Sequence, residues 1–396
     1  YAKGRDGYIA ESIEAYARHS MPLSLFHSNE VGAKRSHIFD ACIAAIGDPT
    51  KTEDYDRILA ILDSKDKIPA INQIGTPETS NGYWYNFWQD DTHVQGIWRK
   101  TTLESYQSGN PKWETVLDLD ALPPPTTDTA NTWVWHGSTL LDEGPGCRWD
   151  RALISLSPGG SDADTTREMD LVSEKFIDPE DGGFAMPTAA KTQISYRSRD
   201  EVLVGSDFDG TGASMTDSGY ARVIKSWKRG TPLSEAKTVF EAEQADIAGA
   251  QFAYHDRGVV HEFQMRSVTF YTAKFWYRSL SAERLAAVSA ADEDTPFVPV
   301  PIPDDAEIST FAGDAMITLR SDWAPPGDCP AAAAEEGGCF KAGALLTAPM
   351  AEVMAEDFSG LKCLFAPTPS KSLQSTATTK DYVVLSVLED VRTTLE

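Results

Sequence analysis

Short runs of aromatic and β-branched residues, separated by Gly, Pro, Asp and Ser, recur from residue 68 to the end of the chain. Eight runs show the pattern: Tyr83–Trp88, Gly96–Thr101, Trp113–Leu117, Trp133–Trp135, Ala152–Leu156, Gln193–Tyr196, Glu201–Val204 and Ala221–Trp227. These runs predict β-strands, because such side chains pack well on a pleated surface. Regularly spaced short strands are typical of a sandwich, a barrel or a propeller, and a propeller repeats a four-stranded unit about every 40 to 50 residues.

Two stretches show such a unit most clearly. Residues 132–177 contain TWVWHGS, RALISLS, PGGSDAD and TTREMDLVSEKFI, and residues 193–243 contain QISYRSRD, EVLVGSDFDG, ARVIKSWKRG and KTVFEAE. Further units are predicted within 251–277, 305–364 and 372–395, and we expect the last to stop after two strands. The predicted fold class is mainly β, an incomplete β-propeller with about five to six blades and an open edge at its end.

Residues 1–67 have a helical period instead. A first helix is predicted near the N-terminus, a second from a cap at Ser36 to a stop at Gly47, and a third over residues 52–63. Apolar stripes at helical spacing predict core packing. The chain is therefore expected to consist of a helical N-terminal segment, 1–67, and an incomplete propeller domain, 68–396.

Residues 281–307 interrupt the strand pattern. SAERLAAVSAADED predicts a short helix, and the proline-rich TPFVPVPIPDDAE favours an extended connection to an edge strand. A flexible linker between domains is the alternative interpretation.

The charge balance argues against partners that are polyanions. The chain has 60 acidic and 35 basic residues and a formal charge of −25, which repels phosphate backbones and anionic membranes. It has no run of the roughly 18 to 20 apolar residues that a membrane span needs, and its first residues lack the apolar core of a signal peptide. A soluble protein is expected, and the start at Tyr1 instead of Met suggests a fragment.

Cysteine usage indicates a reducing compartment. The five cysteines are scattered and form no CxxC pair, so neither a disulfide framework nor a zinc or redox site is predicted. Cys329 and Cys339 lie close together in an Ala- and Gly-rich stretch, and we expect them to be reduced thiols on a mobile surface insertion.

Several short motifs resemble sites but fit structural roles better. Gly159-Gly160-Ser161-Asp162-Ala163 resembles a nucleophile elbow, yet the following DADTTREMDL predicts a turn into another strand where the elbow needs a helix. His261-Glu262 could begin an HExxH zinc motif, but position 265 is Met. Asp207-Phe208-Asp209-Gly210 lacks the further acidic ligands of a calcium loop and predicts a β-turn. The ten tryptophans are expected to pack the blades.

Several sequence segments of the chain resemble the N-terminal half of the prolyl oligopeptidase family, in particular its bacterial-type branch. The matching segments include ILDSKDKIP (61–69), YNFWQD (85–90), GIWRKTTLESY (96–106), WETVLDLDAL (113–122), NTWVWHGS (131–138), RALISLSPGGSDADTTREMDL (151–171), VLVGSDF (202–208), SGYARVIKSWKRGTPLSEAKTVFE (218–241), LRSDW (319–323) and DYVVLSVLEDVR (381–392). They run in the family's order from about residue 56 to the end of the chain, whereas the first 55 residues match poorly. The stretch 324–341 departs from the family and resembles a loop insertion.

The resemblance implies a seven-bladed propeller placed over an α/β-hydrolase domain that carries a Ser–Asp–His triad. In the family that domain follows the propeller, whereas this sequence ends within it. No catalytic residue, no cofactor-binding residue and no metal ligand is therefore predicted in this chain, and no cofactor is expected.

The function expected from the resemblance is that of the propeller portion of a cytoplasmic serine-type oligopeptidase. It would gate the access of short peptides to a catalytic domain that the chain lacks, and its partners would be those peptides and the missing hydrolase domain, with no nucleic acid and no membrane. The chain alone is expected to be inactive and to associate through exposed apolar and unpaired edges. The alternative is a stand-alone, non-catalytic propeller that acts as a protein-interaction module.

Overall fold

A computed structural model describes residues 51–62, 82–125, 132–326 and 340–396. Its internal contacts divide the chain into two units, Tyr1–Ile68 and Pro69–Glu396. In the first unit the described element is helix α3, Glu53–Leu62, whose start is capped by the Thr52 hydroxyl accepting a hydrogen bond from the Tyr55 amide at 3.1 Å. The third predicted helix is thus confirmed, whereas the first two lie outside the described residues.

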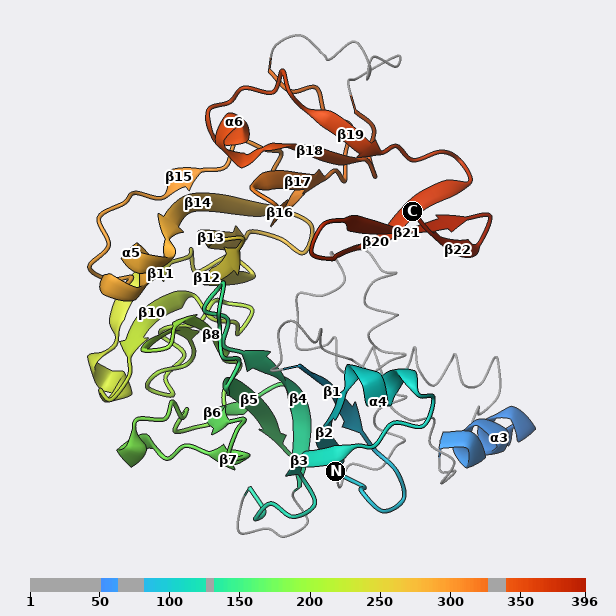
Figure 1. Cartoon of the computed structure of the whole chain (residues 1–396), viewed down its shortest axis with the longest axis vertical. Coiled ribbons are helices and arrows are strands. Elements are labelled where there is room, and N and C mark those ends of the chain that lie inside the picture. Colours follow the sequence, from blue (N-terminus) through green and yellow to red (C-terminus); the bar gives the residue numbers. More distant parts are fainter. Residues whose placement is uncertain (1–50, 63–81, 126–131, 327–339) are drawn as a thin grey trace, which may run out of the picture. The chain divides into compact units, whose positions relative to one another are not determined.

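The second unit is a β-propeller of six sheets, each built from strands that are consecutive in the sequence and antiparallel (Figure 1). Blade 1 consists of β1 (Tyr83–Trp88), β2 (Ile97–Thr102) and β3 (Glu114–Asp118); blade 2 of β4 (Trp133–Leu140), β5 (Arg151–Pro158), β6 (Thr165–Asp170) and β7 (Lys175–Phe176); blade 3 of β8 (Gln193–Ser198), β9 (Glu201–Gly205), β10 (Val223–Lys228) and β11 (Lys237–Glu241). Blade 4 consists of β12 (Ala248–Asp256), β13 (Val259–Ser267), β14 (Ala273–Ser281) and β15 (Val298–Pro299); blade 5 of β16 (Glu307–Phe311), β17 (Asp314–Thr318), β18 (Leu345–Pro349) and β19 (Lys362–Phe365); blade 6 of β20 (Lys371–Thr378), β21 (Val383–Glu389) and β22 (Arg392–Leu395).

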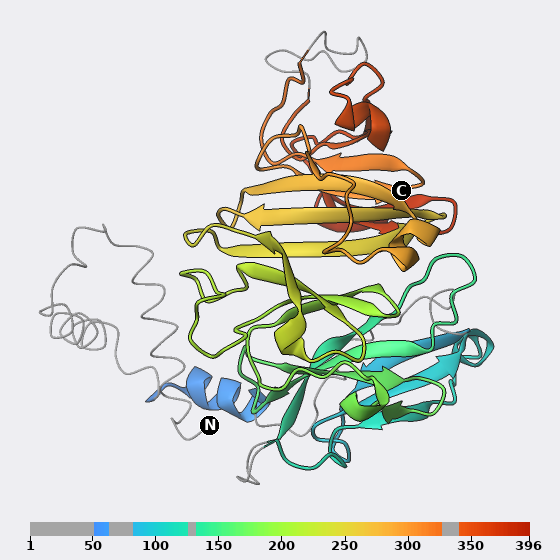
Figure 2. The same cartoon turned by 90° about the vertical axis from the view of Figure 1, so that its left-hand side faces the viewer.

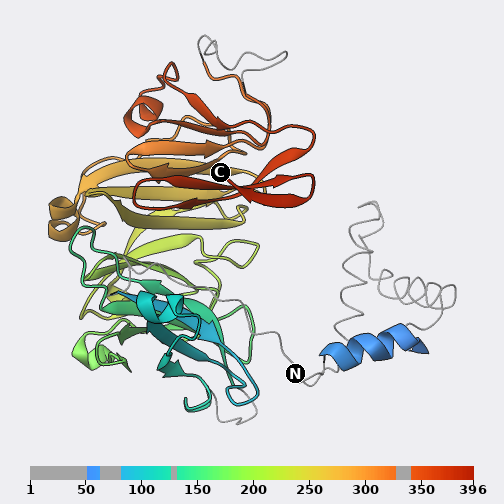
Figure 3. The same ribbon diagram turned by 45° about the vertical axis from the view of Figure 1, so that its right-hand side comes forward.

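The predicted mainly-β propeller of about five to six blades is confirmed, but the prediction for its last unit was wrong. Blade 6 has three strands, where two were expected (Figure 3). The reason is a tight turn at Asp390 and Val391, whose φ angles of 46° and 65° are both positive. Two such residues make a turn that folds β22 back onto β21, although EDVR lacks the glycine that usually marks it.

Successive blades pack face to face through apolar clusters. Blades 1 and 2 share the cluster that contains Trp98 and Ile154, blades 2 and 3 the one that contains Leu153 and Trp227, blades 4 and 5 the one that contains Phe263 and Ile317, and blades 5 and 6 the one that contains Met316 and Val387. The buried Trp98 and Trp227 confirm that these two tryptophans pack blades.

The contact between blades 3 and 4 also contains buried charges. Four side chains, each no more than 5% exposed, meet there: Arg197, Glu201, Glu262 and Arg278. Glu262 on β13 accepts hydrogen bonds from Arg197 Nε of β8 at 3.0 Å and from Arg278 Nε of β14 at 2.7 Å. The guanidinium groups and carboxylates thus compensate one another's charge away from water.

Residues 281–307 add the edge of blade 4. Helix α5, Ala282–Ala287, begins at Ser281, whose hydroxyl accepts a hydrogen bond from the Arg284 amide. The chain then returns as β15, which pairs with β14 at the outer side of the sheet (Figures 1 and 2). The prediction of an extended connection to an edge strand is confirmed, and the alternative of a linker between domains is wrong. Proline is tolerated there because an edge strand leaves one side of its backbone unpaired.

The remaining described elements are two short α-helices, α4 (Leu103–Gln107) between β2 and β3 and α6 (Met350–Met354) after β18, and two 3-10 helices, η4 (Pro179–Asp181) and η5 (Leu233–Glu235). Over the described ranges, no helix combines the length and the apolar character that crossing a bilayer would require. The predicted insertion with Cys329 and Cys339 lies outside the described residues.

Candidate functional site

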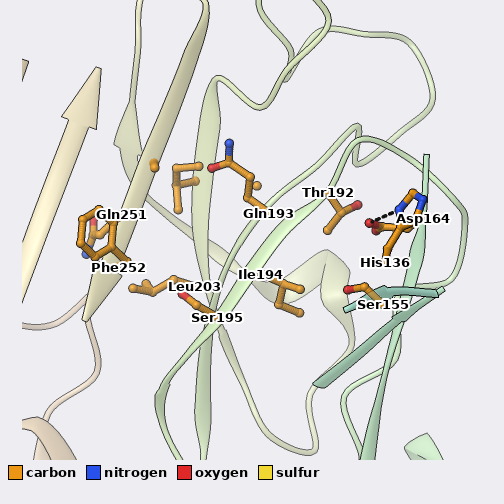
Figure 4. Close-up of a pocket in the computed structure, with 13 residues that line it drawn as sticks. His136, Ser155, Asp164, Thr192, Gln193, Ile194, Ser195, Leu203, Gln251 and Phe252 are labelled. Atoms are coloured by element: carbon orange, nitrogen blue, oxygen red, sulfur yellow. Dashed lines mark hydrogen bonds and ion pairs between the residues drawn. The ribbon is translucent and has the colours of Figure 1, made fainter. Parts of the chain in front are cut away.

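A cavity of about 370 Å³ opens where blades 2, 3 and 4 meet (Figure 4). The first strands of these blades, β4, β8 and β12, contribute most of its polar groups: His136, Gln193, Ser195 and Gln251. In Figure 1 these first strands lie on the inner side of the propeller, and the last strands of the same blades lie outside. The volume is within the lower part of the range of small-molecule and peptide sites.

Three consecutive residues of β8, Gln193, Ile194 and Ser195, line the cavity. Gln193 and Ser195 are two residues apart and share one face of the strand, while Tyr196 of the opposite face is buried in the cluster between blades 2 and 3. Within the part of the chain that the structure describes, neither the Gln193 amide nor the Ser195 hydroxyl has a side-chain hydrogen bond. Both groups are therefore free to bind a ligand.

A β-bulge in β4 places His136 at the cavity. Trp135 is opposite Leu156 and Gly137 is opposite Ser155, so His136 is an extra residue with no partner in the ladder. Gly137 has a φ of 128°, which few other residues adopt. Bulges change the direction of a side chain and are common beside active sites.

The His136 imidazole lies against Asp164, a residue of the connection between β5 and β6. Its Nδ1 is 3.3 Å from Asp164 Oδ2, and the two side chains are 26% and 15% exposed. Two backbone hydrogen bonds with Ala190, of 2.9 and 3.0 Å, hold Asp164 in place. The carboxylate therefore has a fixed position at the cavity wall.

The second oxygen of this carboxylate has no partner. Asp164 Oδ1 is buried and makes no hydrogen bond within the described ranges. Burial raises the pKa of Asp164, and the hydrogen bond and charge of His136 partly oppose that rise. An acceptor in this state is stabilised by any donor or cation that enters the cavity.

The other polar groups of the wall are already bonded. Ser155 Oγ is 2.9 Å from Thr166 Oγ1, and Thr192 Oγ1 is 2.8 Å from Ser206 Oγ. Gln251 donates to Glu262 at 3.1 Å and accepts from Gln264 at 2.9 Å. These bonds hold the wall in place, whereas Asp164 Oδ1, Gln193, Ser195 and the second ring nitrogen of His136 have no side-chain hydrogen-bond partner among the described residues.

The motifs singled out in the sequence are not brought together at this cavity. Ser161 lies in the connection between β5 and β6, and a strand follows it where a nucleophile elbow would need a helix. This agrees with the prediction of a turn into another strand. Glu262 lies on a strand and is bonded to two arginines, so it cannot serve as the Glu of a zinc helix. The Asp207–Gly210 stretch is a loop in which Asp207 accepts from the Gly212 amide. Among the described residues, no group of three or more His, Cys, Asp or Glu side chains could hold a metal ion.

Sequence reasoning missed the His136–Asp164 pair, although one signal for it was present. An isolated glycine within a strand pattern indicates a bulge, and Gly137 stands inside WVWHGSTL. That signal identifies His136 as a residue with an altered direction. It does not identify Asp164, which is 28 residues away in the chain.

Two curated relatives are peptidases by name. The uncharacterized peptidase y4nA of Sinorhizobium fredii is 33% identical over 348 residues, which are 87% of this chain and 43% of that protein. The uncharacterized peptidase RP174 of Rickettsia prowazekii is 27% identical over 320 residues, which are 78% of this chain and 40% of that protein. The chain thus spans less than half the length of these relatives.

Solved structures support the same fold. A post-proline cleaving enzyme from Rickettsia typhi has a TM-score of 0.68 at 24% identity, covering 87% of this chain and 47% of that one. Oligopeptidase B from Leishmania major has a TM-score of 0.54 at 13% identity, covering 93% and 44%. The family model for the N-terminal β-propeller domain of prolyl oligopeptidase matches residues 60–288. With most of the chain's length matched, and with a six-bladed propeller in its structure, this chain belongs to the prolyl oligopeptidase family and represents its N-terminal propeller portion.

Proposed function

We propose that the chain is the helical N-terminal segment, 1–67, and the propeller, 68–396, of a serine-type oligopeptidase, and that the propeller restricts which peptides reach the catalytic part. The observation that carries the proposal is the match of residues 60–288 to the propeller domain of this peptidase family. The relatives named as peptidases are more than twice as long as the part that aligns. The catalytic residues are then expected beyond the matched part.

Selection by size follows from the packing of the blades. Apolar clusters between neighbouring sheets hold them at fixed separations, because well-packed cores resist deformation. A rigid arrangement of sheets mounted over an active site would admit an extended peptide and exclude a folded domain. Binding groups on its inner strands, such as those of the cavity, would contact the peptide as it enters.

The hydrolytic chemistry is proposed to lie outside the residues that the structure describes. Acyl transfer from a peptide requires a nucleophile beside a general base, with donors for the oxyanion. The His136 imidazole of the cavity is beside a carboxylate, as a general base would be, but the nearby Ser155 hydroxyl is already bonded to Thr166. Turnover is therefore assigned to the catalytic part, and the chain alone is proposed to be inactive.

The proposed compartment and partners follow from composition. A reducing cytoplasm fits the two described cysteines, Cys147 and Cys363, both of which are free thiols. Short peptides and the catalytic domain are the proposed partners, and the charge of −25 argues against nucleic acid.

The test is to sequence the reading frame beyond the codon for Glu396, express the extended protein, and measure kcat/KM for peptides of increasing length. The same measurement is made on the catalytic part without the propeller, residues 68–396. We expect a steep loss of rate with length in the extended protein and a shallower one without the propeller. Equal length profiles would refute the gating role, and a reading frame without a hydrolase would favour a stand-alone interaction module.

A further inference from the structure

We propose that the cavity between blades 2, 3 and 4 binds the ammonium group of a peptide, with Asp164 as the partner of the charge. The ligand class rests on the proposed function, since it takes peptides as the molecules that pass the inner strands. The ammonium group is inferred from the cavity itself.

The first argument is the state of the Asp164 carboxylate. Its Oδ1 is buried and lacks any partner among the described residues, which is costly for a buried acceptor. Lys191 follows Ala190, the backbone partner of Asp164, but it contacts Asp162 at 3.4 Å and lies over the Tyr220 ring. The neighbouring cation is thus engaged elsewhere, and a cation supplied by a ligand would complete the site.

The second argument distinguishes an ammonium group from other ligands. Asp164 Oδ2 already faces His136 Nδ1, so one carboxylate oxygen is available, whereas a guanidinium group pairs best with two. An ammonium group has three N–H donors and acts as a compact charge. Gln193 and Ser195 also line the cavity, and their amide oxygen and hydroxyl are acceptors for N–H donors.

The third argument is that the site is built into the sheets. The bulge at His136 turns its side chain to Asp164, and the hydrogen bonds with Ala190 hold the Asp164 backbone. Figure 4 shows the His136–Asp164 pair on one side of the cavity, with Thr192 and Gln193 beside it. His136 is therefore a positioning residue, because its ring holds the Oδ2 atom of Asp164.

The experiment measures peptide binding to this 396-residue chain by calorimetry at about 0.15 M salt, where surface charge is largely screened. Four tetrapeptides of Gly and Ala are compared: one with a free α-amine, the same peptide N-acetylated, an N-acetylated peptide with one lysine, and an N-acetylated peptide with one arginine. We expect the free amine, the lysine or both to bind about tenfold more tightly than the acetylated and arginine peptides. The two arms identify whether the ammonium comes from the N-terminus or from lysine.

Asp164→Asn is compared with Asp162→Asn, a matched control. Both variants remove one negative charge from the same connection, but the Asp162 side chain is 83% exposed. We expect Asp164→Asn to abolish the preference for ammonium peptides and Asp162→Asn to retain it. His136→Gln is expected to weaken the preference while its melting temperature stays near that of the parent chain.

Equal binding of the amine and acetylated peptides, no binding of any peptide, or a preference that survives Asp164→Asn would overturn the inference. A failure of the gating role is distinguishable from these results. It would appear as unchanged length profiles in the hydrolysis assay, with the ammonium preference of this chain intact.

Discussion

Replacement of Glu262 by Gln is expected to weaken the contact between blades 3 and 4 severely. Glu262 is fully buried and accepts from Arg197, Arg278 and Gln251. Together with Glu201, its carboxylate balances the charges of the two arginines. The substitution leaves this buried group with one net positive charge.

The magnitude follows from the bonds that are lost. Gln keeps one acceptor oxygen but has an NH₂ donor where the second carboxylate oxygen was. An N–H group of either Arg197 or Arg278 then points at this NH₂ group, and neither donor has an acceptor. A lost hydrogen bond to a charged group costs about 1.5–3 kcal/mol, and breaking a buried ion pair by removing one partner costs about 3–5 kcal/mol in total. We expect the free energy of unfolding to fall by about 3–5 kcal/mol.

The assay is urea unfolding followed by tryptophan fluorescence. With a slope of about 3 kcal/mol per molar urea, the midpoint of Glu262→Gln should fall by about 1 M or more. The control is Glu307→Gln, which removes a strand carboxylate paired with Arg320 at the surface, where the side chains are 62% and 46% exposed. That pair should contribute about 1 kcal/mol or less.

A double substitution tests the cause. Arg278→Gln in the Glu262→Gln background restores the charge balance, so the two changes together should cost less than the sum of their separate effects, with a coupling of about 1–3 kcal/mol. If Glu262→Gln shifts the midpoint no further than Glu307→Gln, the ion group does not stabilise the contact and the reasoning fails.

Three further predictions concern single sites. Ser161→Ala should change the free energy of unfolding by no more than about 0.5 kcal/mol, because Ser161 is an exposed connection residue, and labelling of Ser161 by a fluorophosphonate probe would contradict this. Cys329 and Cys339 should be reduced in freshly lysed cells, and a peptide linked through both in non-reducing mass spectrometry would show otherwise. Burial lowers the pKa of His261 from 6.5, so folding favours the neutral ring, and its contribution to stability is complete above pH 6.5 and declines below it. His261→Phe should therefore lose less melting temperature between pH 7.5 and pH 5.5 than the parent chain, and identical losses would refute this.

Most strands and the family resemblance could be predicted from the sequence, because strands are marked by short runs of particular residue types and the resemblance by short matching segments. The period-two runs at Tyr83–Trp88 and Gln193–Tyr196 became β1 and β8 with little change in bounds, and the prolines near 298–301 predicted an edge strand. The turn at Asp390 was missed, because its residues lack the usual glycine signal and the run around them has the same apolar pattern as a single strand.

The candidate site needed the tertiary structure. His136 and Asp164 are 28 residues apart, and Arg197 and Glu262 are 65 apart. Each of these residues stands in a strand pattern or turn that is ordinary by itself. The sequence by itself determined where most of the longer strands lie, since runs of aromatic and β-branched residues favour a pleated surface. The packing of one blade on the next decided which polar groups meet and which oxygen stays without a partner, because those contacts depend on the placement of one sheet against another, which no local pattern encodes.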